Sequence, residues 1–498
     1  METILFLRKV EESDKEIIYK WINDPVTRAN SFNQEPVSYE DHEKWFEKKM
    51  LDPDCHHYIL MAANSPAGVL RLDRSEEDGN YVVSINLSPL MRGRGYASEA
   101  LKLLCGQALA EIPDARILHA EVKKNNVPSC KAFEKAGFSV IYNTGGEEPV
   151  SIYEYRLERY NVIYFRCDGG GNVGAGHIMR CLSIADACRK EGLFPVFLLA
   201  GHEMESFVRD RGYIVSVLET PYDILFSEIP VLIERIPDES TIVIDSYFVT
   251  DSYISSLNNR GYCIILLDDT GEKCFDVDCI INYNIYAAKE MYGRNDLRLL
   301  MGPSYAPIRS SFCGQSYNVR PELRRILITT GAGDPYHICV SMLQGFLEWP
   351  RDLEIQVICG KFNPDREILS KVAETYAGRV SLITDVNDLS EYMRGSDFLI
   401  AAAGSTIYEA CAIGIPMAVF TYADNQIPGA EAFAERVGTT YLGDYREQTF
   451  ELVHRAISTL EEFQEADVRQ TLSDHMHELV DGEGASRIAR ILYAYTDN

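Results

Sequence analysis

From Val162 onward the chain carries a series of short, unbroken apolar runs, and this pattern constrains the fold more than any other feature of the sequence. Runs such as VIYFRC, FPVFLLA, TIVID and CIILLDD lack the polar–apolar alternation of a half-exposed strand. They are typical of parallel strands covered on both faces, and helix-length segments separate them. A second series, RRILITT, EIQVICG, VSLIT, DFLIAAA and PMAVFT, begins near Arg324. The sequence therefore predicts two consecutive α/β units with a cleft between them.

Residues 1–158 follow a different pattern, in which strands and helices are mixed. This order favours a mostly antiparallel sheet with segregated helices, an α+β domain. We expect three domains in all: 1–158, 161–320 and 321–498, the last ending in a helical tail from Thr449 to which the sequence assigns no function. The expected helices of the first domain are Lys15–Trp21, Tyr39–Lys49, Gly95–Ile112 and Val127–Ala136, and its clearest strands are His57–Met61, Gly68–Leu72, Tyr81–Leu87 and Ile117–Val122.

Composition limits the classes of function. The 498 residues exceed the size of one core, and no apolar window is long enough to span a membrane. Charges within the first residues, METILFLRKVEE, leave no signal-peptide core, so we expect a cytoplasmic protein. Thirteen cysteines without a C-x-x-C pair indicate neither a disulfide framework nor a zinc site, and we expect no metal. The net charge of −27 opposes binding to nucleic acid or anionic membranes, although helix N-termini could still hold small anions.

The segment GGGNVGAGHIMRCL contains a literal G-x-G-x-x-G at Gly169, Gly171 and Gly174. A dinucleotide-binding fold would place an acidic residue at the end of the second strand, about 20 residues later. That strand, FPVFLLAGHE, ends in Gly201 and His202, so NAD binding is disfavoured. The glycines instead leave His177 as the functional group at a helix start, where a neutral imidazole suits a general base. A simple capping role is the alternative.

Polar residues at the ends of other strands complete a possible site. Gly404, Ser405 and Thr406 begin a helix and could donate to a diphosphate, while Glu409 could accept from ribose hydroxyls or be a solvated helix residue. The carboxylates at strand ends could hold a sugar or could cap the following turns. These carboxylates are Asp168, Asp245, Asp268 and Asp269, and Asn425 and Gln426 are further candidates for contacts with sugar or phosphates.

In the first domain, VSINLSPLMRGRGYASEALKLL places a strand, an Arg-Gly-Arg-Gly loop and a helix in succession. Such a loop could hold a diphosphate, or could be only a tight turn. With AEVKKNNVPSCKAFEKAGF, this segment resembles the GNAT acetyltransferases over residues 1 to about 158. The resemblance implies acetyl-CoA as co-substrate, with the pantetheine arm along the strand ending at Leu87. It implies pyrophosphate contacts from Arg92, Gly93, Arg94, Gly95 and Ala97, and a cofactor contact from Asn126.

The acetyl acceptor would be an amine that attacks the thioester, a reaction that depends on positioning and on a donor to the oxyanion. Many GNAT members carry a Tyr acid where this chain has Phe133, so Cys130, Tyr96 or water would have to replace it. The segments WINDPVTRANSF and SYEDHEKWF look like the acceptor half of GNAT enzymes that acetylate amino sugars or protein N-termini. His42 in the second segment could deprotonate the amine, or could be a buried core residue.

The region from Val162 resembles the GT-B architecture, a doubly built Rossmann-like arrangement. LITDVNDLSEYMRGSDFLIAAAGSTIYEA is similar to the UDP-binding lobe of the MurG-type GlcNAc transferases. That resemblance implies UDP, with uracil near Val386 and the phosphates at the Gly404–Thr406 loop.

Within GT-B, the order FRCDGGGNVGAGHIMRCL, VIDSYF, LLDDTGE, INYNIYA, GPSYAPIR, AAAGSTIYEA and ADNQ resembles the UDP-sugar hydrolases of pseudaminic acid biosynthesis, over about residues 161–435. The resemblance implies release of UDP from UDP-2,4-diacetamido-2,4,6-trideoxy-β-L-altropyranose, with His177 as catalytic base and Tyr247 in the active site. The matched segments also make Gly176 and Asn284 candidate substrate contacts, and the Gly-rich turn TTGAGDP, at the end of a strand, makes Gly331 another.

The fusion implies that the first domain acetylates the 4-amino group of the preceding UDP-linked amino sugar. Three alternatives stay open. The second region could be a MurG-type glycosyltransferase in which His177 deprotonates an acceptor hydroxyl, or a non-catalytic UDP-sugar binding protein. The first domain could be an inactive GNAT relic that binds acetyl-CoA without transferring the acetyl group. The sequence leaves the oligomeric state open.

Overall fold

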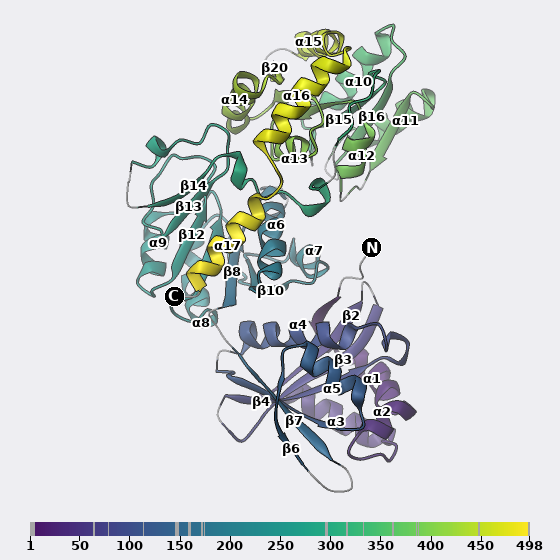
Figure 1. The fold of residues 1–498 in the computed structure, drawn as a ribbon, viewed down its shortest axis with the longest axis vertical. Coiled ribbons are helices and arrows are strands. Elements are labelled where there is room, and N and C mark those ends of the chain that lie inside the picture. Colours follow the sequence, from purple (N-terminus) through teal and green to yellow (C-terminus); the bar gives the residue numbers. More distant parts are fainter. Residues whose placement is uncertain are drawn as a thin grey trace.

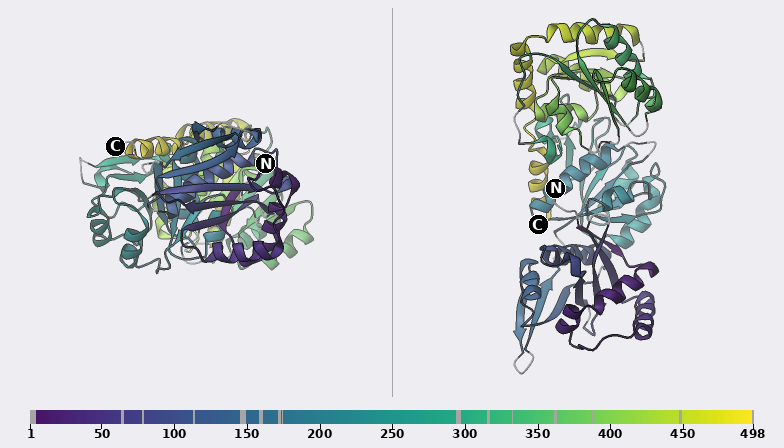
Figure 2. Two further views of the ribbon diagram at one scale, coloured as in Figure 1. Left: turned by 90° about the horizontal axis from the view of Figure 1, so that it is seen from below. Right: turned by 90° about the vertical axis from the view of Figure 1, so that its right-hand side faces the viewer.

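The computed structural model describes residues 5–62, 65–77, 79–112, 114–144, 149–157, 161–170, 173, 175–293, 297–314, 317–331, 333–360, 363–384, 386, 388–446 and 449–496. These residues form three β-sheets, each covered by its own helices (Figure 1). The three layered bodies follow one another along the longest axis of the molecule (Figure 2). The two consecutive α/β units expected from Val162 onward are thereby confirmed.

The first sheet has the order β1-β2-β3-β4-β5-β7-β6, and only β4 and β5 run parallel. Their pairing covers Asn80–Val82 and Ile117–His119, so the two strands diverge before β4 reaches Leu87. The mostly antiparallel sheet expected from the sequence is confirmed. The elements are β1 Leu5–Lys9, α1 Lys15–Ile22, α2 Pro25–Asn30, α3 Tyr39–Leu51, β2 Cys55–Ala62, β3 Ser65–Arg74, β4 Asn80–Leu87, α4 Tyr96–Glu111, β5 Ile117–Lys123, α5 Val127–Lys135, β6 Ser139–Asn143 and β7 Val150–Arg156.

The second sheet is entirely parallel, with the order β10-β9-β8-β11-β12-β13-β14. The order reverses between β8 and β11, which makes the carboxyl ends of these two strands the switch point where doubly wound sheets bind ligands. Its elements are β8 Val162–Cys167, α6 Gly176–Lys190, β9 Phe194–Leu199, α7 Glu205–Arg209, β10 Ile214–Val217, α8 Ile229–Arg235, β11 Thr241–Asp245, α9 Asp251–Asn258, β12 Cys263–Leu267, β13 Cys279–Asn282 and β14 Arg298–Met301.

The third sheet, also parallel, has the order β17-β16-β15-β18-β19-β20, with its switch point between β15 and β18. Its strands are buried on both faces, as the unbroken apolar runs require. Its elements are β15 Arg325–Thr329, α10 Ile338–Glu348, β16 Glu354–Cys359, α11 Arg366–Thr375, β17 Val380–Thr384, α12 Ser390–Gly395, β18 Phe398–Ala402, α13 Thr406–Ile413, β19 Met417–Thr421, α14 Ile427–Val437, β20 Thr440–Asp444, α15 Thr449–Glu462 and α16 Ala466–Leu479.

Helix α17 (Gly484–Thr496) leaves the third sheet and returns to the second, where it lies along α6 (Figure 1). Ile488 and Leu492 are fully buried there, in one apolar cluster with Ile178 and Cys181 of α6. The sequence pattern predicts that the whole tail belongs with residues 321–498. In the structure, however, its last helix, α17, packs on the second-sheet unit.

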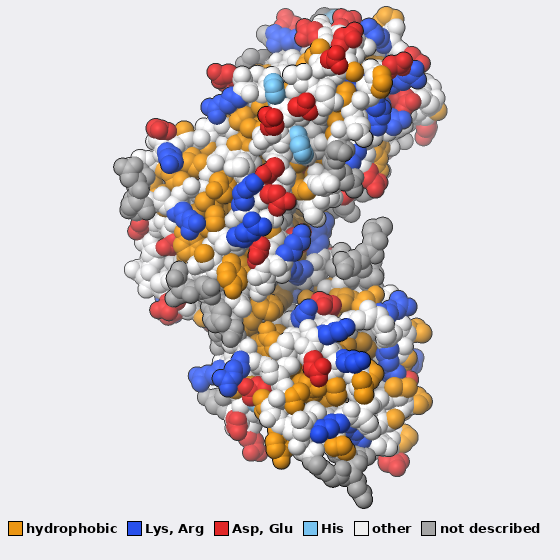
Figure 3. Space-filling model, viewed as in Figure 1, with side chains coloured by type: hydrophobic (Ala, Val, Ile, Leu, Met, Phe, Trp, Pro, Cys, Tyr) orange, Lys and Arg blue, Asp and Glu red, His pale blue; other side chains and the backbone are white. Residues whose placement is uncertain are grey.

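Helix α4 joins the first sheet to the second. Its buried residues surround the helix, and Phe194 of β9 and Ile214 of β10 lie against Gly106. The apolar core of the first domain is therefore continuous with one face of the second sheet. On the face seen in Figure 3, acidic and basic side chains are interspersed over all three bodies. None of the helices among the described residues is long and apolar enough to cross a bilayer.

Candidate active sites

The carboxyl ends of β8 and β11 bring His177 and Asp245 together. β8 leads through the glycine-rich loop into α6, whose second residue is His177, and β11 ends at Asp245. The imidazole Nδ1 lies 2.5 Å from Asp245 Oδ1, and both side chains are buried. When Nδ1–H donates to the carboxylate, Nε2 of the neutral ring carries the lone pair. Arg180 Nη2 also lies 2.9 Å from Nδ1. In the Nδ1–H tautomer, His177 is oriented as a general base would be. Gly171 and Gly174 of the loop lie outside the described residues.

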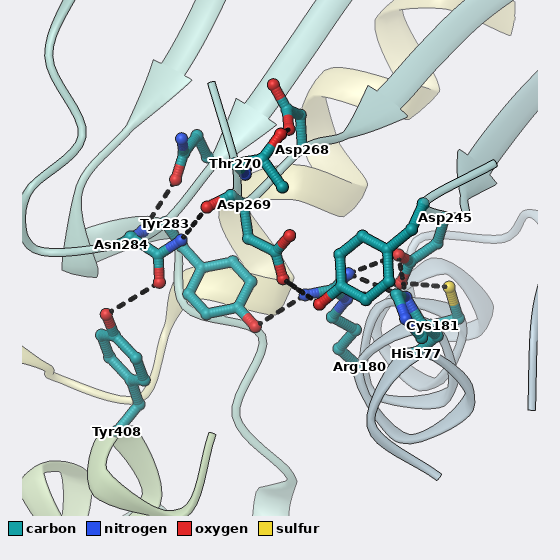
Figure 4. Close-up of polar contacts among 12 residues, drawn as sticks. His177, Arg180, Cys181, Asp245, Asp268, Asp269, Thr270, Tyr283, Asn284 and Tyr408 are labelled. Carbon is teal, nitrogen blue, oxygen red and sulfur yellow. Dashed lines mark hydrogen bonds and ion pairs between the residues drawn. The ribbon is translucent and has the colours of Figure 1, made fainter. Parts of the chain in front are cut away.

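Arg180, one helical turn after His177, holds the same carboxylate. Its Nε donates to Asp245 Oδ2 at 2.5 Å, and its Nη1 donates to Asp269 Oδ2 at 2.9 Å. The Tyr283 hydroxyl accepts a further hydrogen bond from Nη1 at 3.2 Å. Figure 4 shows the guanidinium between the two aspartates. Arg180 therefore ties the carboxyl end of β11 to the loop that follows β12.

Tyr247 covers His177 from the side. Its ring packs edge-on to the imidazole at 4.6 Å, and its hydroxyl donates to Asp269 Oδ2 at 3.0 Å. Tyr247 is half-exposed and lines a cavity of about 370 Å³ together with Asp245, Asp268 and Asp269. Asn425, from the third-sheet unit, also lines this cavity. The cavity thus spans both α/β units at the end of the sheet where His177 lies.

The charges of this group shift its pKa values. Burial alone would raise the pKa of the Asp245 carboxyl, but Arg180 and His177 outweigh it and hold that pKa well below the ordinary value. Burial and the Asp269 charge raise the pKa of Tyr247 far above its ordinary value. Asp245 is therefore an anion and Tyr247 a neutral hydroxyl over the physiological pH range.

Asp168 belongs to a separate buried network. Arg166 Nη1 donates to Asp168 Oδ1 at 2.6 Å, and Arg166 Nε donates to Glu228, which also accepts from the Tyr253 hydroxyl. Asp168 Oδ2 has no hydrogen-bond partner among the described residues. Asp268 instead accepts from the backbone N–H and the hydroxyl of Thr270, so it caps its own turn.

The expected phosphate contacts lie at the switch point of the third sheet. Gly331 follows β15, and Gly404 and Ser405 precede α13, which begins at Thr406. Gly331 has φ of 88°, and no described atom lies near the place where a Cβ would stand at Gly331 or Gly404. Both positions leave open space beside the start of α13, but the Gly404 N–H already donates to the Ala402 carbonyl at 2.8 Å, so Ser405 and Thr406 carry the N–H groups that an anion could bind there.

The other expected nucleotide contacts are more dispersed. Glu409 pairs with Arg309, whose Nη2 lies 2.7 Å from Oε1, so this carboxylate already has a cationic partner. Burial raises the pKa of Glu409, and Arg309 opposes this rise. Gln426 Oε1 accepts from the backbone N–H of Tyr422, and Val386 is half-buried.

The segment Tyr283–Tyr286, after β13, connects the two α/β units. Asn284 Nδ2 and the Tyr286 hydroxyl both donate to the backbone carbonyl of Asp269, at 3.2 and 2.8 Å. From α13 of the third-sheet unit, the Tyr408 hydroxyl donates to Asn284 Oδ1 at 3.2 Å and accepts from the backbone N–H of Ile285 at 3.1 Å. Asn284 thus lies at a junction between the units (Figure 4).

In the first domain, the Arg-Gly-Arg-Gly loop leads directly into α4. Gly93 and Gly95 have φ of 76° and 82°, a left-handed backbone that favours glycine, and no described atom approaches their missing Cβ positions. Arg94 and Ala97 flank the first turn of α4. The loop leaves backbone N–H groups accessible beside Leu87, where β4 and β5 diverge.

Arg92 is engaged elsewhere in the same domain. Its Nη1 pairs with Asp24, the N-cap of α2, at 2.6 Å, and its Nη2 donates to the Thr27 hydroxyl at 2.8 Å. Thr27 in turn donates to Asn86 Oδ1 at 3.0 Å. Arg92 therefore connects the Arg-Gly-Arg-Gly loop to α2. Asn126 caps α5 by accepting from Ser129 N.

Phe133, which stands where many GNAT members carry a Tyr acid, and His42, the candidate base, are both buried. Phe133 stacks on Tyr153 with ring centroids 5.5 Å apart. His42 is fully buried, its Nε2 lies 3.0 Å from the Lys15 carbonyl, and desolvation lowers its pKa. The structure thus places His42 in the core, among Tyr19, Trp45 and Phe46.

Sequence reasoning missed Arg180, Tyr283 and Tyr408. Arg180 carried a signal, because a charged residue three positions after His177, beside the apolar residues Ile178, Cys181 and Leu182, must find a buried partner. Tyr283 and Tyr408 gave no such signal, since their hydroxyl partners come from distant segments. Within the described residues, no group of three or more His, Cys, Asp or Glu side chains has the arrangement of a metal site.

Two family models match the chain. The acetyltransferase (GNAT) domain matches residues 5–139, and the glycosyltransferase family 28 C-terminal domain matches residues 326–482. The chain therefore has a GNAT acetyltransferase domain at its N-terminus, followed by a GT-B-like region whose last unit is similar to family 28 glycosyltransferases.

Three curated relatives match between about half and two thirds of this chain. The uncharacterized protein MJ1062 of Methanocaldococcus jannaschii is 24% identical over 57% of this chain, which spans 60% of that relative's length. The spore coat polysaccharide biosynthesis protein SpsG of Bacillus subtilis is 23% identical over 65% of this chain and 96% of its own. The UDP-2,4-diacetamido-2,4,6-trideoxy-β-L-altropyranose hydrolase of Campylobacter jejuni is 26% identical over 55% of this chain and 96% of its own.

Solved structures match about a third of the chain. The spermidine N-acetyltransferase of Vibrio cholerae, in complex with CoA and spermine, is 19% identical over 31% of this chain and 97% of its own, with a TM-score of 0.29. The aminoglycoside acetyltransferase AAC(6')-Ib in complex with coenzyme A is 17% identical over 31% of this chain and 96% of its own, with a TM-score of 0.28.

Proposed function

We propose that this chain is a bifunctional enzyme of amino-sugar nucleotide metabolism. Its GT-B-like region hydrolyses UDP-2,4-diacetamido-2,4,6-trideoxy-β-L-altropyranose, and its GNAT domain uses acetyl-CoA to acetylate the 4-amino group of the UDP-sugar that precedes it. The observation that carries the hydrolase assignment is the buried His177–Asp245 pair at a switch point, beside a cavity that both α/β units line. The similarity to the Campylobacter hydrolase supports the choice of substrate.

In the hydrolytic step, His177 Nε2 takes a proton from water while the water oxygen attacks the anomeric carbon. The bond from this carbon to the UDP oxygen breaks, the electron pair leaves with UDP, and the configuration inverts. Asp245 accepts the Nδ1–H hydrogen bond and stabilises the imidazolium that forms. Tyr247, whose ring lies against the imidazole, restricts the side on which water can approach.

The leaving group is held by the third-sheet unit. The backbone N–H groups and the hydroxyls of Ser405 and Thr406 stabilise the charge that develops on the diphosphate. Gly331, at the neighbouring strand end, leaves room for the phosphates, and Asn425 reaches the sugar side of the cavity. In this proposal these donors take the role that a metal ion has in other diphosphate sites.

The GNAT domain supplies positioning for acetyl transfer. The pyrophosphate of acetyl-CoA lies at Gly93, Gly95 and the start of α4, and the pantetheine arm lies along β4 toward Leu87. The free amine attacks the thioester carbonyl, and the thiolate of CoA leaves. Acetylation of the 4-amino group yields the diacetamido sugar that the second region would hydrolyse, so the fusion joins consecutive reactions. Thirteen free cysteines fit a reducing compartment, and we place both reactions in the cytoplasm.

The first experiment measures UDP release from the diacetamido UDP-sugar with no acceptor present. The parent should release UDP and free sugar, and His177→Ala should lower the rate at least about 100-fold, because it removes the general base. His202→Ala, at an exposed histidine of the same unit, is the matched control. UDP-sugar binding without release by the parent would contradict hydrolysis and favour a glycosyltransferase or a binding protein.

The acetyltransferase is tested separately by following CoA release with the 4-amino UDP-sugar. The parent should release one CoA for each sugar acetylated. Binding of acetyl-CoA without transfer would identify the first domain as an inactive relic.

A further inference from the structure

The helix that begins at the expected diphosphate loop also contacts the sheet that carries His177. α13 starts at Thr406, and two residues later the Tyr408 side chain reaches into the second-sheet unit. Its hydroxyl makes two hydrogen bonds there, one to Asn284 Oδ1 and one from the backbone N–H of Ile285. Tyr408 is 4% exposed.

From Tyr408 a continuous series of hydrogen bonds leads to the histidine. Asn284 donates to the backbone carbonyl of Asp269. The Asp269 carboxylate accepts from Arg180, and Arg180 donates to Asp245, which holds His177. Figure 4 shows this series from Tyr408 to His177.

The rings beside Tyr408 support the same connection. Tyr283, whose hydroxyl accepts from Arg180, packs edge-on against Tyr408 with centroids 5.3 Å apart. The ring of Phe433 in α14 also packs edge-on against the Tyr408 ring, with centroids 5.3 Å apart. In addition, Arg436 of α14 donates to the Ile285 carbonyl at 2.6 Å. The segment Tyr283–Tyr286 is therefore fixed from the third-sheet unit at several points.

We propose that Tyr408 is a positioning residue that couples the nucleotide-binding helix α13 to the hydrolytic pair His177–Asp245. This inference rests on the proposed UDP-sugar hydrolysis. By holding Asn284 and Ile285, the Tyr408 hydroxyl fixes the Asp269 loop, and through it the guanidinium that orients Asp245. Correct seating of the diphosphate at the start of α13 then coincides with correct orientation of His177, so water is activated only when the leaving group is held.

The hydroxyl is separable from the ring. Tyr408→Phe keeps the contacts with Tyr283 and Phe433 but removes both hydrogen bonds to the second-sheet unit. Because α13 itself is unchanged, the affinity for UDP should stay within about twofold, while kcat for UDP release should fall about tenfold or more, because both hydrogen bonds that hold Asn284 and Ile285 are lost.

The matched control is Tyr317→Phe. The Tyr317 hydroxyl donates to the Ser396 carbonyl at 2.7 Å, within the same third-sheet unit, and packs against the same apolar core as Tyr408. This variant should lose a comparable amount of thermal stability with no change in kcat. A second variant, Asn284→Ala, and the double variant with Tyr408→Phe complete the set.

The results are read in order. If the parent releases no UDP, the proposed function fails and the coupling has no reaction to act on. If the parent is active, a fall of kcat in Tyr408→Phe with unchanged UDP affinity supports the coupling, and a double variant no slower than Asn284→Ala shows that the two residues act as one unit. Equal kcat in Tyr408→Phe and Tyr317→Phe, or a loss of UDP affinity that accounts for the slower rate, would overturn it.

Discussion

One buried carboxylate holds two functional side chains in this molecule. Asp245 is fully buried and holds both His177 and Arg180, and Arg180 passes the connection on to Asp269. His177 was predictable, because it follows a bare glycine loop at a helix start. Asp245 was predictable only as one of several carboxylates at strand ends, since the sequence does not reveal which strands are neighbours at a switch point. The structure selects Asp245 by placing β11 beside β8.

The first prediction concerns Asp245→Asn. An amide cannot neutralise Arg180 or hold His177 as an anion does. Removal of one partner from a buried ion pair costs about 3–5 kcal/mol, which is an upper bound here because Asp269 still pairs with Arg180. UDP release should fall at least about 100-fold, and the unfolding temperature should drop. Initial rates and thermal unfolding measure both effects. Asp238→Asn, at an exposed ion pair with Arg260, is the control, and a rate within threefold of the parent for Asp245→Asn would contradict the role of the pair.

The second prediction concerns acid stability of the first domain. Burial, with the nearby charge of Arg71, lowers the pKa of His57 to about 4. Between the ordinary histidine pKa of about 6.5 and 4, the unfolded chain binds a proton that the folded chain does not. The free energy of unfolding should therefore fall as the pH falls through this window, by up to about 3 kcal/mol. His57→Leu should flatten the dependence, measured by urea unfolding at several pH values. Equal slopes in parent and variant would show that His57 does not titrate this way.

At the scale of elements, the sequence predicts where helices and strands occur much better than it predicts which elements pack against each other. The unbroken apolar runs located the parallel strands because both faces of those strands are buried. The tail was recognised as helical, but the apolar stripe of α17 specifies burial and not the surface that buries it. This stripe packs against α6, which lies far earlier in the sequence. Likewise, the sequence predicts a helix at α4 but not its contact with Phe194. That contact depends on the absence of a side chain at Gly106.

The third prediction tests the seat of α17. A Cβ at Gly484 would lie 2.1 Å from the Ala306 carbonyl oxygen, and backbone cannot move aside as a side chain can. Gly484→Ala should displace the first turn of α17 and lower the free energy of unfolding by about 1–3 kcal/mol, despite the better helix propensity of Ala. Gly201→Ala, where a Cβ meets open space among the described residues, is the control. Thermal unfolding distinguishes them, and equal stability would show that α17 tolerates the shift.

At the scale of the whole molecule, the GNAT domain and the second-sheet unit share one apolar core across α4. The fourth prediction follows from this continuity. A chain that begins at residue 161 would expose Phe194 and Ile214, so its second-sheet unit should unfold several degrees below that of the full chain. In the full chain, acetyl-CoA should raise the unfolding temperature of both parts together, because binding to the native state stabilises the cooperative unit. Scanning calorimetry tests both points. Independent transitions, with only the first moved by acetyl-CoA, would contradict a shared core.

The return of α17 to α6 also has a consequence for biosynthesis. The strands of the second sheet are complete at Met301, but the helix that covers α6 begins roughly 180 residues later. At a translation rate of about 5–20 residues per second, the ribosome needs roughly 10–40 s to make the intervening segment. During that time α6, the helix that carries His177, packs on the strands of its own sheet but lacks the cover of α17. The second-sheet unit is therefore completed only after the GNAT domain has had time to fold.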